Sequence, residues 1–153
     1  MAAAVDGLRR LQGVQGTLAG ARKISESALD SFYGVARELY ANGHYAEALQ
    51  SFELLCLYEH DNVRNWHALG VCRQVTGDYG GAAAALTFAV DQFDDTAPGL
   101  RLALAECLIL CGALAAAGNV LGEIVANDDT LNERERGKVK LLESRLTEPG
   151  RES

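Results

Sequence analysis

A six-residue phrase that recurs three times constrains the fold of this chain more than any other feature. It reads Gly-His-Tyr-Ala-Glu-Ala at residues 43–48, and it returns 34 residues later as Gly-Asp-Tyr-Gly-Gly-Ala at residues 77–82. A third copy, Gly-Ala-Leu-Ala-Ala-Ala at residues 112–117, lacks the tyrosine. A period of this length with a glycine at the turn is typical of paired helices that stack on their neighbours. The repeat therefore favours a recognition protein over an enzyme.

The composition supports an all-helical fold. The 153 residues suit one domain, and 48% of them are hydrophobic and 23% charged, which is ordinary for a globular protein. Only two prolines occur, Pro98 and Pro149, and long stretches between the glycines are rich in alanine and leucine. Because these residues are good helix formers, we predict an all-α chain.

The second copy identifies the repeat type. Trp66, Leu69 and Gly70 precede it and match the Trp-x-x-Leu-Gly opening of tetratricopeptide repeats, so we predict three tetratricopeptide helix pairs forming a curved solenoid. The predicted parts are an N-terminal arm at residues 1–28, repeats at about 29–62, 63–96 and 98–131, a capping helix at 132–147 and a flexible tail at 148–153.

The register also predicts the turns, the core and the helix starts. The glycines at 43, 77 and 112 fall where a first helix ends and a left-handed backbone is convenient. Gly70 and Ala82 are small where two helices cross closely. Residues 27–30 and 130–133 are predicted to be capping boxes. The predicted core positions are Phe32, Val35, Ala36, Leu39, Ala48, Phe52, Leu55, Trp66, Leu69, Leu86, Ala89, Leu104, Ala105, Leu108, Ala117, Leu121, Ile124, Val139, Leu142 and Leu146.

The N-terminal arm is a weak helix by itself. Leu11, Val14 and Leu18 share one helical face, but four glycines interrupt the segment, and each weakens a helix by up to about 1 kcal/mol relative to alanine. We interpret the arm as a self-association or docking segment, with disorder as the alternative.

Charge and hydropathy restrict the partners and the location. The net charge of −7 disfavours nucleic acids and anionic membrane surfaces, which both require a basic surface. We see neither a secretory signal nor an apolar run of roughly 20 residues that could insert into a membrane. A cytoplasmic protein is therefore expected.

No constellation of residues predicts catalysis, a metal or a cofactor. Cys56, Cys72, Cys107 and Cys111 have no partner pair that completes a zinc site, and we interpret them as small apolar residues in the helix packing. The three histidines occupy unrelated repeat positions, and no serine lies in a nucleophile motif. We therefore expect a protein that is not an enzyme and that carries no cofactor.

The outward face of each first helix should form the binding wall of the solenoid. Tyr33, Arg37 and Tyr40 fall at i, i+4 and i+7, so they share one face. Tyrosines offer apolar rings for a ligand's side chains and hydroxyls for its backbone. The complete predicted wall is Asp30, Tyr33, Arg37, Tyr40, Arg64, His67, Val71, Gln74, Leu102, Glu106 and Ile109.

This wall could have two other roles. In the first, Tyr33 and Tyr40 pack only against the N-terminal arm and bind no ligand. In the second, the wall binds a C-terminal carboxylate, as the carboxylate clamp of heat-shock cochaperones does, but it lacks the clustered lysine and asparagine that such a clamp requires. We therefore expect an apolar, extended ligand.

Several segments resemble the class II chaperones of bacterial type III secretion, which look after pore-forming translocators. The resemblance extends from Gly16 to about Asn127. It rests on Gly-Thr-Leu-Ala at 16–19, Leu-Asp-Ser-Phe-Tyr at 29–33, residues 43–48, Phe-Glu-Leu-Leu-Cys at 52–56, Leu-Gly-Val-Cys-Arg-Gln at 69–74, Ala-Glu-Cys-Leu at 105–108 and Ile-Val-Ala-Asn at 124–127.

The resemblance implies a bacterial cytoplasmic chaperone that binds two hydrophobic translocators through extended Pro-x-Leu-x-x-Pro segments and prevents their premature association. It also implies a homodimer formed through N-terminal helices. The groove positions of the family correspond to Tyr33, Tyr40 and Tyr45, with Tyr58 and His60 at the end of the first repeat. Arg37 stands where a relative carries an aromatic residue. The alternative function is a general tetratricopeptide scaffold that joins folded partners.

Overall fold

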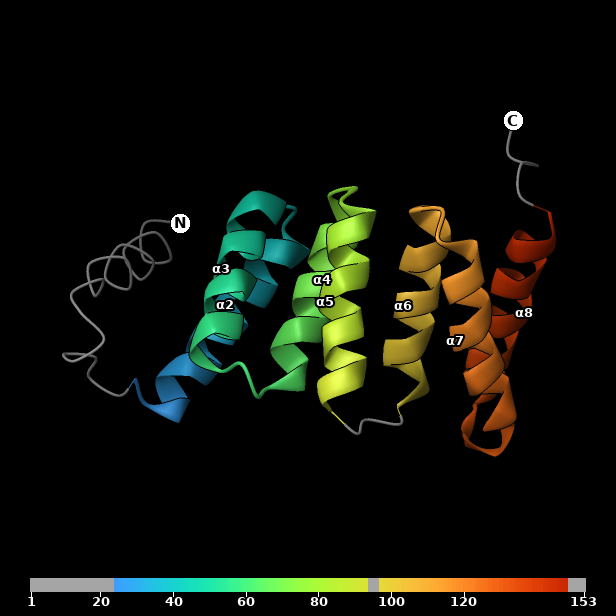
Figure 1. Cartoon of the computed structure of the whole chain (residues 1–153). Helices are drawn as coiled ribbons and strands as arrows, with labels where there is room; N and C mark the ends of the chain where they lie inside the picture. Colours follow the sequence, from blue (N-terminus) through green and yellow to red (C-terminus); the bar gives the residue numbers. More distant parts are fainter. Residues whose placement is uncertain (1–23, 94–96, 149–153) are drawn as a thin grey trace. The chain divides into compact units, whose positions relative to one another are not determined.

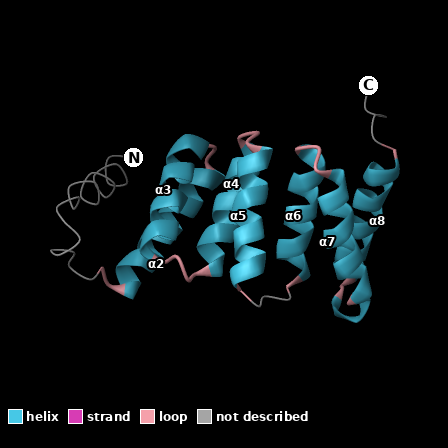
Figure 2. Cartoon of the chain, viewed as in Figure 1, coloured by secondary structure: helices cyan, strands magenta, loops and turns pink. Residues whose placement is uncertain are grey.

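The computed structural model describes residues 24–93 and 97–148, and within these ranges it contains helices and no strand (Figures 1 and 2). The three predicted helix pairs and the final helix are confirmed. The predicted arm, apart from its last five residues, and residues 149–153 of the tail lie outside the described residues. The helices are α2 (Glu26–Ala41), α3 (Tyr45–Tyr58), α4 (Val63–Val75), α5 (Tyr79–Gln92), α6 (Pro98–Leu110), α7 (Leu114–Ala126), the short 3-10 helix η1 (Asp128–Thr130) and α8 (Glu133–Thr147).

The chain divides into two compact units, Met1–His60 and Asp61–Ser153. In the described part of the first unit, α2 packs against α3 as one helix pair. In the second unit, α4 packs on α5, α5 on α6 and α6 on α7, so that consecutive helices are neighbours. The final helix, α8, contacts both α6 and α7 and thereby covers the last pair, as a terminal cap of a repeat array must.

Each pair turns through the same hydrogen-bonded motif. Gly43, Gly77 and Gly112 have φ angles of 81°, 83° and 84°, which confirms the predicted left-handed turns. At the first turn, the N–H of Gly43 donates to the carbonyl of Tyr40 (3.1 Å) and the N–H of His44 to that of Leu39 (2.9 Å). The other two turns repeat both bonds at the equivalent positions. This is the Schellman motif, which satisfies the last carbonyls of a helix.

The predicted core is largely confirmed. The buried members include Ala36, Phe52, Leu69, Leu86 and Leu121, whereas some flanking positions are half-buried, Phe32, Leu39 and Trp66 among them. Gly70 lies close to α5, because a Cβ at this position would come within 2.6 Å of Leu86 Cγ. The predicted need for a small residue where α4 crosses α5 is therefore confirmed.

Both predicted capping boxes are wrong by two residues. The N-cap of α2 is Ser25, whose Oγ accepts from the N–H of Ala28 at 3.2 Å, whereas the prediction placed the cap at Ser27. The capping box of α8 pairs Asn132 with Glu135, with both bonds at 2.9 Å, whereas the prediction used Thr130 and Glu133. Each of these stretches offers several good capping residues, and only the backbone path selects among them.

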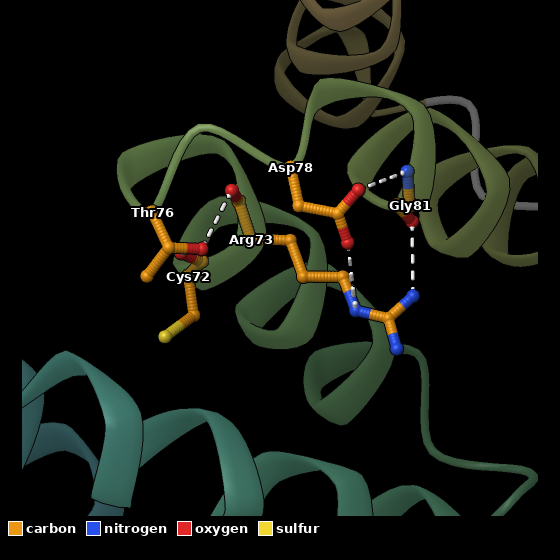
Figure 3. Close-up of polar contacts among 5 residues, drawn as sticks. All are labelled: Cys72, Arg73, Thr76, Asp78 and Gly81. Atoms are coloured by element: carbon orange, nitrogen blue, oxygen red, sulfur yellow. Dashed lines mark hydrogen bonds and ion pairs between the residues drawn. The ribbon is translucent and has the colours of Figure 1, made fainter.

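A polar clamp fixes the turn between α4 and α5 (Figure 3). Asp78 caps α5 by accepting from the N–H of Gly81 at 2.9 Å. Arg73 lies 3.9 Å from the same carboxylate through Nε, and its Nη1 donates to the carbonyl of Gly81 at 3.2 Å. Thr76 Oγ1 donates to the carbonyls of Cys72 and Arg73 at the end of α4. These contacts join the last turn of α4 to the first turn of α5.

We predict that Gly81→Ala lowers the free energy of unfolding relative to its neighbour variant Gly80→Ala. A Cβ at residue 81 would meet Asp78 Cγ at 2.7 Å and displace the capping carboxylate, whereas a Cβ at residue 80 would meet nothing within 4 Å. Both variants gain the same helix propensity, so the difference between them isolates the cap, which is worth about 1 kcal/mol. Urea unfolding followed by circular dichroism measures this difference, and equal stabilities would contradict the role of the clamp.

Candidate functional site

Two aromatic pairs link α2 to α3 in the first unit. The Tyr33 and Phe52 rings lie 5.8 Å apart between centroids at an interplanar angle of 60°. The Tyr40 and Tyr45 rings lie 5.4 Å apart at 66°. Both pairs have the edge-to-face geometry that aromatic rings prefer. Because Phe52 is buried, it braces Tyr33 from the core side.

These rings are accessible enough to contact a ligand. Tyr33 and Tyr40 are half-buried, and Tyr45 is 37% exposed. The structure therefore brings three of the sequence-predicted site residues together on one helix pair. Half-buried tyrosines held by neighbouring rings lose little conformational entropy on binding. We call Tyr33, Tyr40 and Tyr45 the tyrosine face.

Arg37 lies on α2 between Tyr33 and Tyr40 in sequence, and its side chain is exposed. It is the only lysine or arginine between residues 24 and 60, a stretch with six carboxylates. Among the described residues it takes part in no ion pair. Among the described residues of the first unit, Arg37 is thus the one lysine or arginine on the helix that carries Tyr33 and Tyr40. Asp30, one more predicted wall residue on α2, is exposed.

The end of α3 presents apolar surface that is only partly among the predicted site residues. Tyr58 is 42% exposed and His60 is also exposed, and both are residues that the resemblance assigns to the groove. Leu57 is 78% exposed, the largest value among the large hydrophobic residues of the described chain, and it was not predicted. A signal existed in the sequence, because five consecutive apolar residues at 54–58 cannot all lie on the buried face of one helix.

The second unit carries its own set of predicted wall residues on α4. Arg64 is exposed, whereas His67, Val71 and Gln74 are half-buried. Their spacing of i, i+3, i+7 and i+10 places them along one side of the helix. This helix contains two arginines and no carboxylate. It therefore presents a weakly cationic and partly apolar side.

The predicted wall of the third repeat meets α8 instead of solvent. Leu102 was expected on the exposed face, and this prediction is wrong, because the side chain is 2% exposed in a cluster with Leu121 and Leu142. Ile109 packs against the same cluster. Glu106 is paired with Lys138 of α8, with Oε2 and Nζ 2.8 Å apart. The register of α6 alone could not predict that this face is covered, because its burial depends on where α8 docks.

Three of the four cysteines behave as predicted. Cys56, Cys72 and Cys107 are buried, but Cys111 is exposed at the end of α6, so its predicted place in the packing is wrong. Burial raises the pKa of the Cys107 thiol to about 11, with smaller contributions from Glu106 and Cys111 and an opposing one from Lys138. A thiol with this pKa is a poor nucleophile at neutral pH.

A cavity of about 170 Å³ lies where α6 begins and α7 ends. Two of its lining residues form an ion pair, in which Arg101 Nη1 and Glu123 Oε2 are 3.1 Å apart. Its volume is below the ~300 Å³ at which small-molecule sites begin, and we assign it no ligand. In the described ranges, no group of three or more His, Cys, Asp or Glu is placed to hold a metal ion. The lining is Pro98, Arg101, Glu123, Ile124, Asn127, Thr130 and Leu131.

The segments that carried the resemblance have structural roles where the structure describes their contacts. Cys72 is buried and Arg73 forms the clamp to α5. Ala105 and Cys107 are buried, and Glu106 between them pairs with α8. The segments around Cys72 and Cys107 therefore maintain the helix packing, whereas the segments at 29–33 and 43–48 supply Tyr33 and Tyr45 of the tyrosine face.

Helix pairs with this turn, core and terminal cap define a tetratricopeptide-repeat protein. A family model described as a tetratricopeptide repeat matches residues 76–134. Low calcium response locus protein H of Yersinia pestis is 31% identical over 132 residues, which cover 84% of this chain and 78% of that protein. The chain therefore belongs to the same family as low calcium response locus protein H.

Solved structures agree with this assignment. The type III secretion translocator chaperone SycD of Yersinia enterocolitica is 31% identical, with a TM-score of 0.69 over 84% of this chain and 98% of SycD. SycD in complex with a peptide of the translocator YopD matches at 26% identity and a TM-score of 0.68, covering 81% and 98%. PcrH from Pseudomonas aeruginosa matches at 25% identity and a TM-score of 0.72, covering 86% and 100%.

The relatives named as chaperones thus share both sequence and fold with this chain. The expectation of a translocator chaperone is confirmed at the level of the family. Concerning membranes, no helix in residues 24–93 or 97–148 is long and apolar enough to span a bilayer.

Proposed function

We propose that this protein holds extended N-terminal segments of two hydrophobic translocators and prevents their association before export. The observation that carries the proposal is the tyrosine face, three half-exposed rings held by edge-to-face contacts on the first helix pair. The complex of SycD with a YopD peptide supports it, because a member of the same family binds a translocator segment. The protein acts in the bacterial cytoplasm, as a binding protein without catalytic activity or cofactor.

The ligand of this proposal is a Pro-x-Leu-x-x-Pro-like segment. A proline favours an extended conformation of the residue before it, so less entropy is lost when the segment docks. Burying a leucine-sized anchor is worth roughly 1.5–3 kcal/mol. After the cost of association, a few such anchors give an affinity of around micromolar. This strength suits a chaperone that must release its cargo.

The proposed binding residues extend over both units, and each unit contributes its own surface. The first unit offers the tyrosine face, Arg37 and the end of α3. The second unit offers the side of α4 and the margin of α6, where Glu106 pairs with Lys138. The full proposed set is Tyr33, Arg37, Tyr40, Tyr45, Tyr58, His60, Arg64, His67, Val71, Gln74 and Glu106.

We predict that the double variant Tyr33→Ala and Tyr40→Ala binds a translocator segment at least tenfold more weakly, because each ring contributes about 1.5 kcal/mol or more of buried apolar contact. Isothermal titration calorimetry with a synthetic Pro-x-Leu-x-x-Pro peptide measures the affinity. Since Tyr33 also packs on Phe52, Tyr40→Ala alone serves as a second variant that spares this contact.

The matched control replaces both tyrosines by phenylalanine, which keeps the rings and removes the hydroxyls. This variant should retain most of the affinity if the rings supply apolar contact. Circular dichroism verifies that each variant is folded. If folded alanine variants bind the peptide as tightly as the native chain, the tyrosine face is not the binding site.

We also propose that the protein forms a homodimer through its N-terminal arm. SycD has been solved as more than one dimer, since one of its structures is described as an alternative dimer (28% identity, TM-score 0.67, covering 81% of this chain and 98% of SycD). The arm contains Leu11, Val14 and Leu18 on one helical face among four glycines, so a helix there gains from a partner surface.

Deleting residues 1–20 is predicted to shift the protein toward the monomer while the helix pairs remain folded. The deletion removes the apolar stripe of the arm and leaves every described helix intact. Sedimentation velocity measures the mass, and thermal unfolding of the same sample serves as the control. A truncated protein that sediments with the unchanged dimer mass would contradict the role of the arm.

A further inference from the structure

The charge around the tyrosine face is unusual. Residues 24–60 contain six carboxylates and a single cation of the lysine or arginine type, Arg37. This cation follows Tyr33 by four residues and precedes Tyr40 by three, so it lies on the same side of α2 as both rings. A ligand that touches the tyrosine face therefore also comes near one guanidinium group.

Arg37 differs from the three described cations whose carboxylate partners lie within 4 Å. Arg73 lies near Asp78, Arg101 near Glu123 and Lys138 near Glu106, at 3.9, 3.1 and 2.8 Å. Arg37 has no carboxylate or hydrogen-bond acceptor among the described residues, and its side chain is exposed. Its five donors are thus available to a ligand.

We propose that the segment bound at the tyrosine face carries an aspartate or glutamate next to one of its apolar anchors, and that Arg37 binds this carboxylate. The inference rests on the proposed function. A guanidinium and a carboxylate match in shape and can form two parallel hydrogen bonds. Apolar anchors on the rings exclude water around the pair, which strengthens it relative to a fully solvated pair.

The position of the carboxylate follows from helix geometry. Arg37 is displaced along α2 by about 6 Å from Tyr33 and about 4.5 Å from Tyr40, at 1.5 Å per residue. An extended ligand advances about 3.3 Å per residue. The carboxylate therefore lies within about two residues of an anchor, at a variable position of a Pro-x-Leu-x-x-Pro segment.

The surrounding charges make this preference selective. Because six carboxylates accompany one lysine or arginine in residues 24–60, the local charge is negative, which disfavours a ligand carboxylate that is not close to Arg37. One acidic residue in the right place then fixes the register of the segment, and the same residue two positions away weakens binding. Arg37 thus supplies an attractive contribution, and the negative charge of residues 24–60 supplies a repulsive one.

The test uses synthetic Pro-Ala-Leu-Ala-Ala-Pro peptides in which each alanine is replaced in turn by aspartate or by asparagine. For the native chain, aspartate at one position should bind about two- to fivefold more tightly than asparagine at the same position, the range of a partly exposed ion pair. Arg37→Gln should abolish this difference, and Arg37→Lys should keep part of it. Arg37→Glu should reverse the difference, so that the asparagine peptide binds more tightly than the aspartate peptide at that position.

Arg134→Gln is the matched control, because Arg134 is an exposed cation on α8 and lies outside the proposed site. This variant should retain the aspartate preference of the native chain. The inference is overturned if no position favours aspartate, or if the aspartate preference is the same in Arg37→Gln as in the native chain.

The neutral peptide separates this inference from the proposed function. If the alanine peptide binds in a tyrosine-dependent way while aspartate gives no gain, only the role of Arg37 is wrong. If no peptide binds the native chain, or if binding ignores Tyr33 and Tyr40, the proposed function fails and the inference fails with it.

Discussion

The reversal of the chain at a left-handed glycine is the constraint on which the rest of the structure depends. Gly43, Gly77 and Gly112 adopt φ angles between 81° and 84°, a region that costs a residue with a Cβ about 1 kcal/mol or more. Each glycine ends one helix and lets the next begin within a few residues. The two helices of a pair must then run side by side, which is why Gly70 lies so close to Leu86.

The same turn also builds part of the candidate site. Tyr40 stands three residues before Gly43 and Tyr45 two residues after it, so the reversal brings their rings to 5.4 Å. The equivalent positions are Gln74 and Tyr79 in the second pair and Ile109 and Leu114 in the third. The tyrosine pair therefore belongs to the first pair alone. In the third pair the equivalent face of α6 packs against α8, so the repeats share one backbone but not one surface.

The repeat period was sufficient to predict the helix pairs, the glycine turns and most of the core, because these features depend on local spacing. It failed where two segments must meet. Leu102 is buried because α8 docks on α6, and the spacing within one helix contains no information on that contact. The predicted positions of the caps at Ser25 and Asn132 were wrong by two residues, because neighbouring residues can cap equally well. The tyrosines were predicted for the site, but their ring partners became visible only in the structure.

The central claim is that an extended translocator segment binds on the tyrosine face of the first helix pair. Backbone amide chemical shifts of the ¹⁵N-labelled full chain, recorded with and without a Pro-x-Leu-x-x-Pro peptide, test it most directly. The account predicts that the perturbed amides cluster along α2 and the start of α3, around Tyr33, Tyr40 and Tyr45, while the exposed side of α8 around Leu141 is unchanged. Perturbations confined to α5, α7 or α8, with none near the three tyrosines, would contradict it.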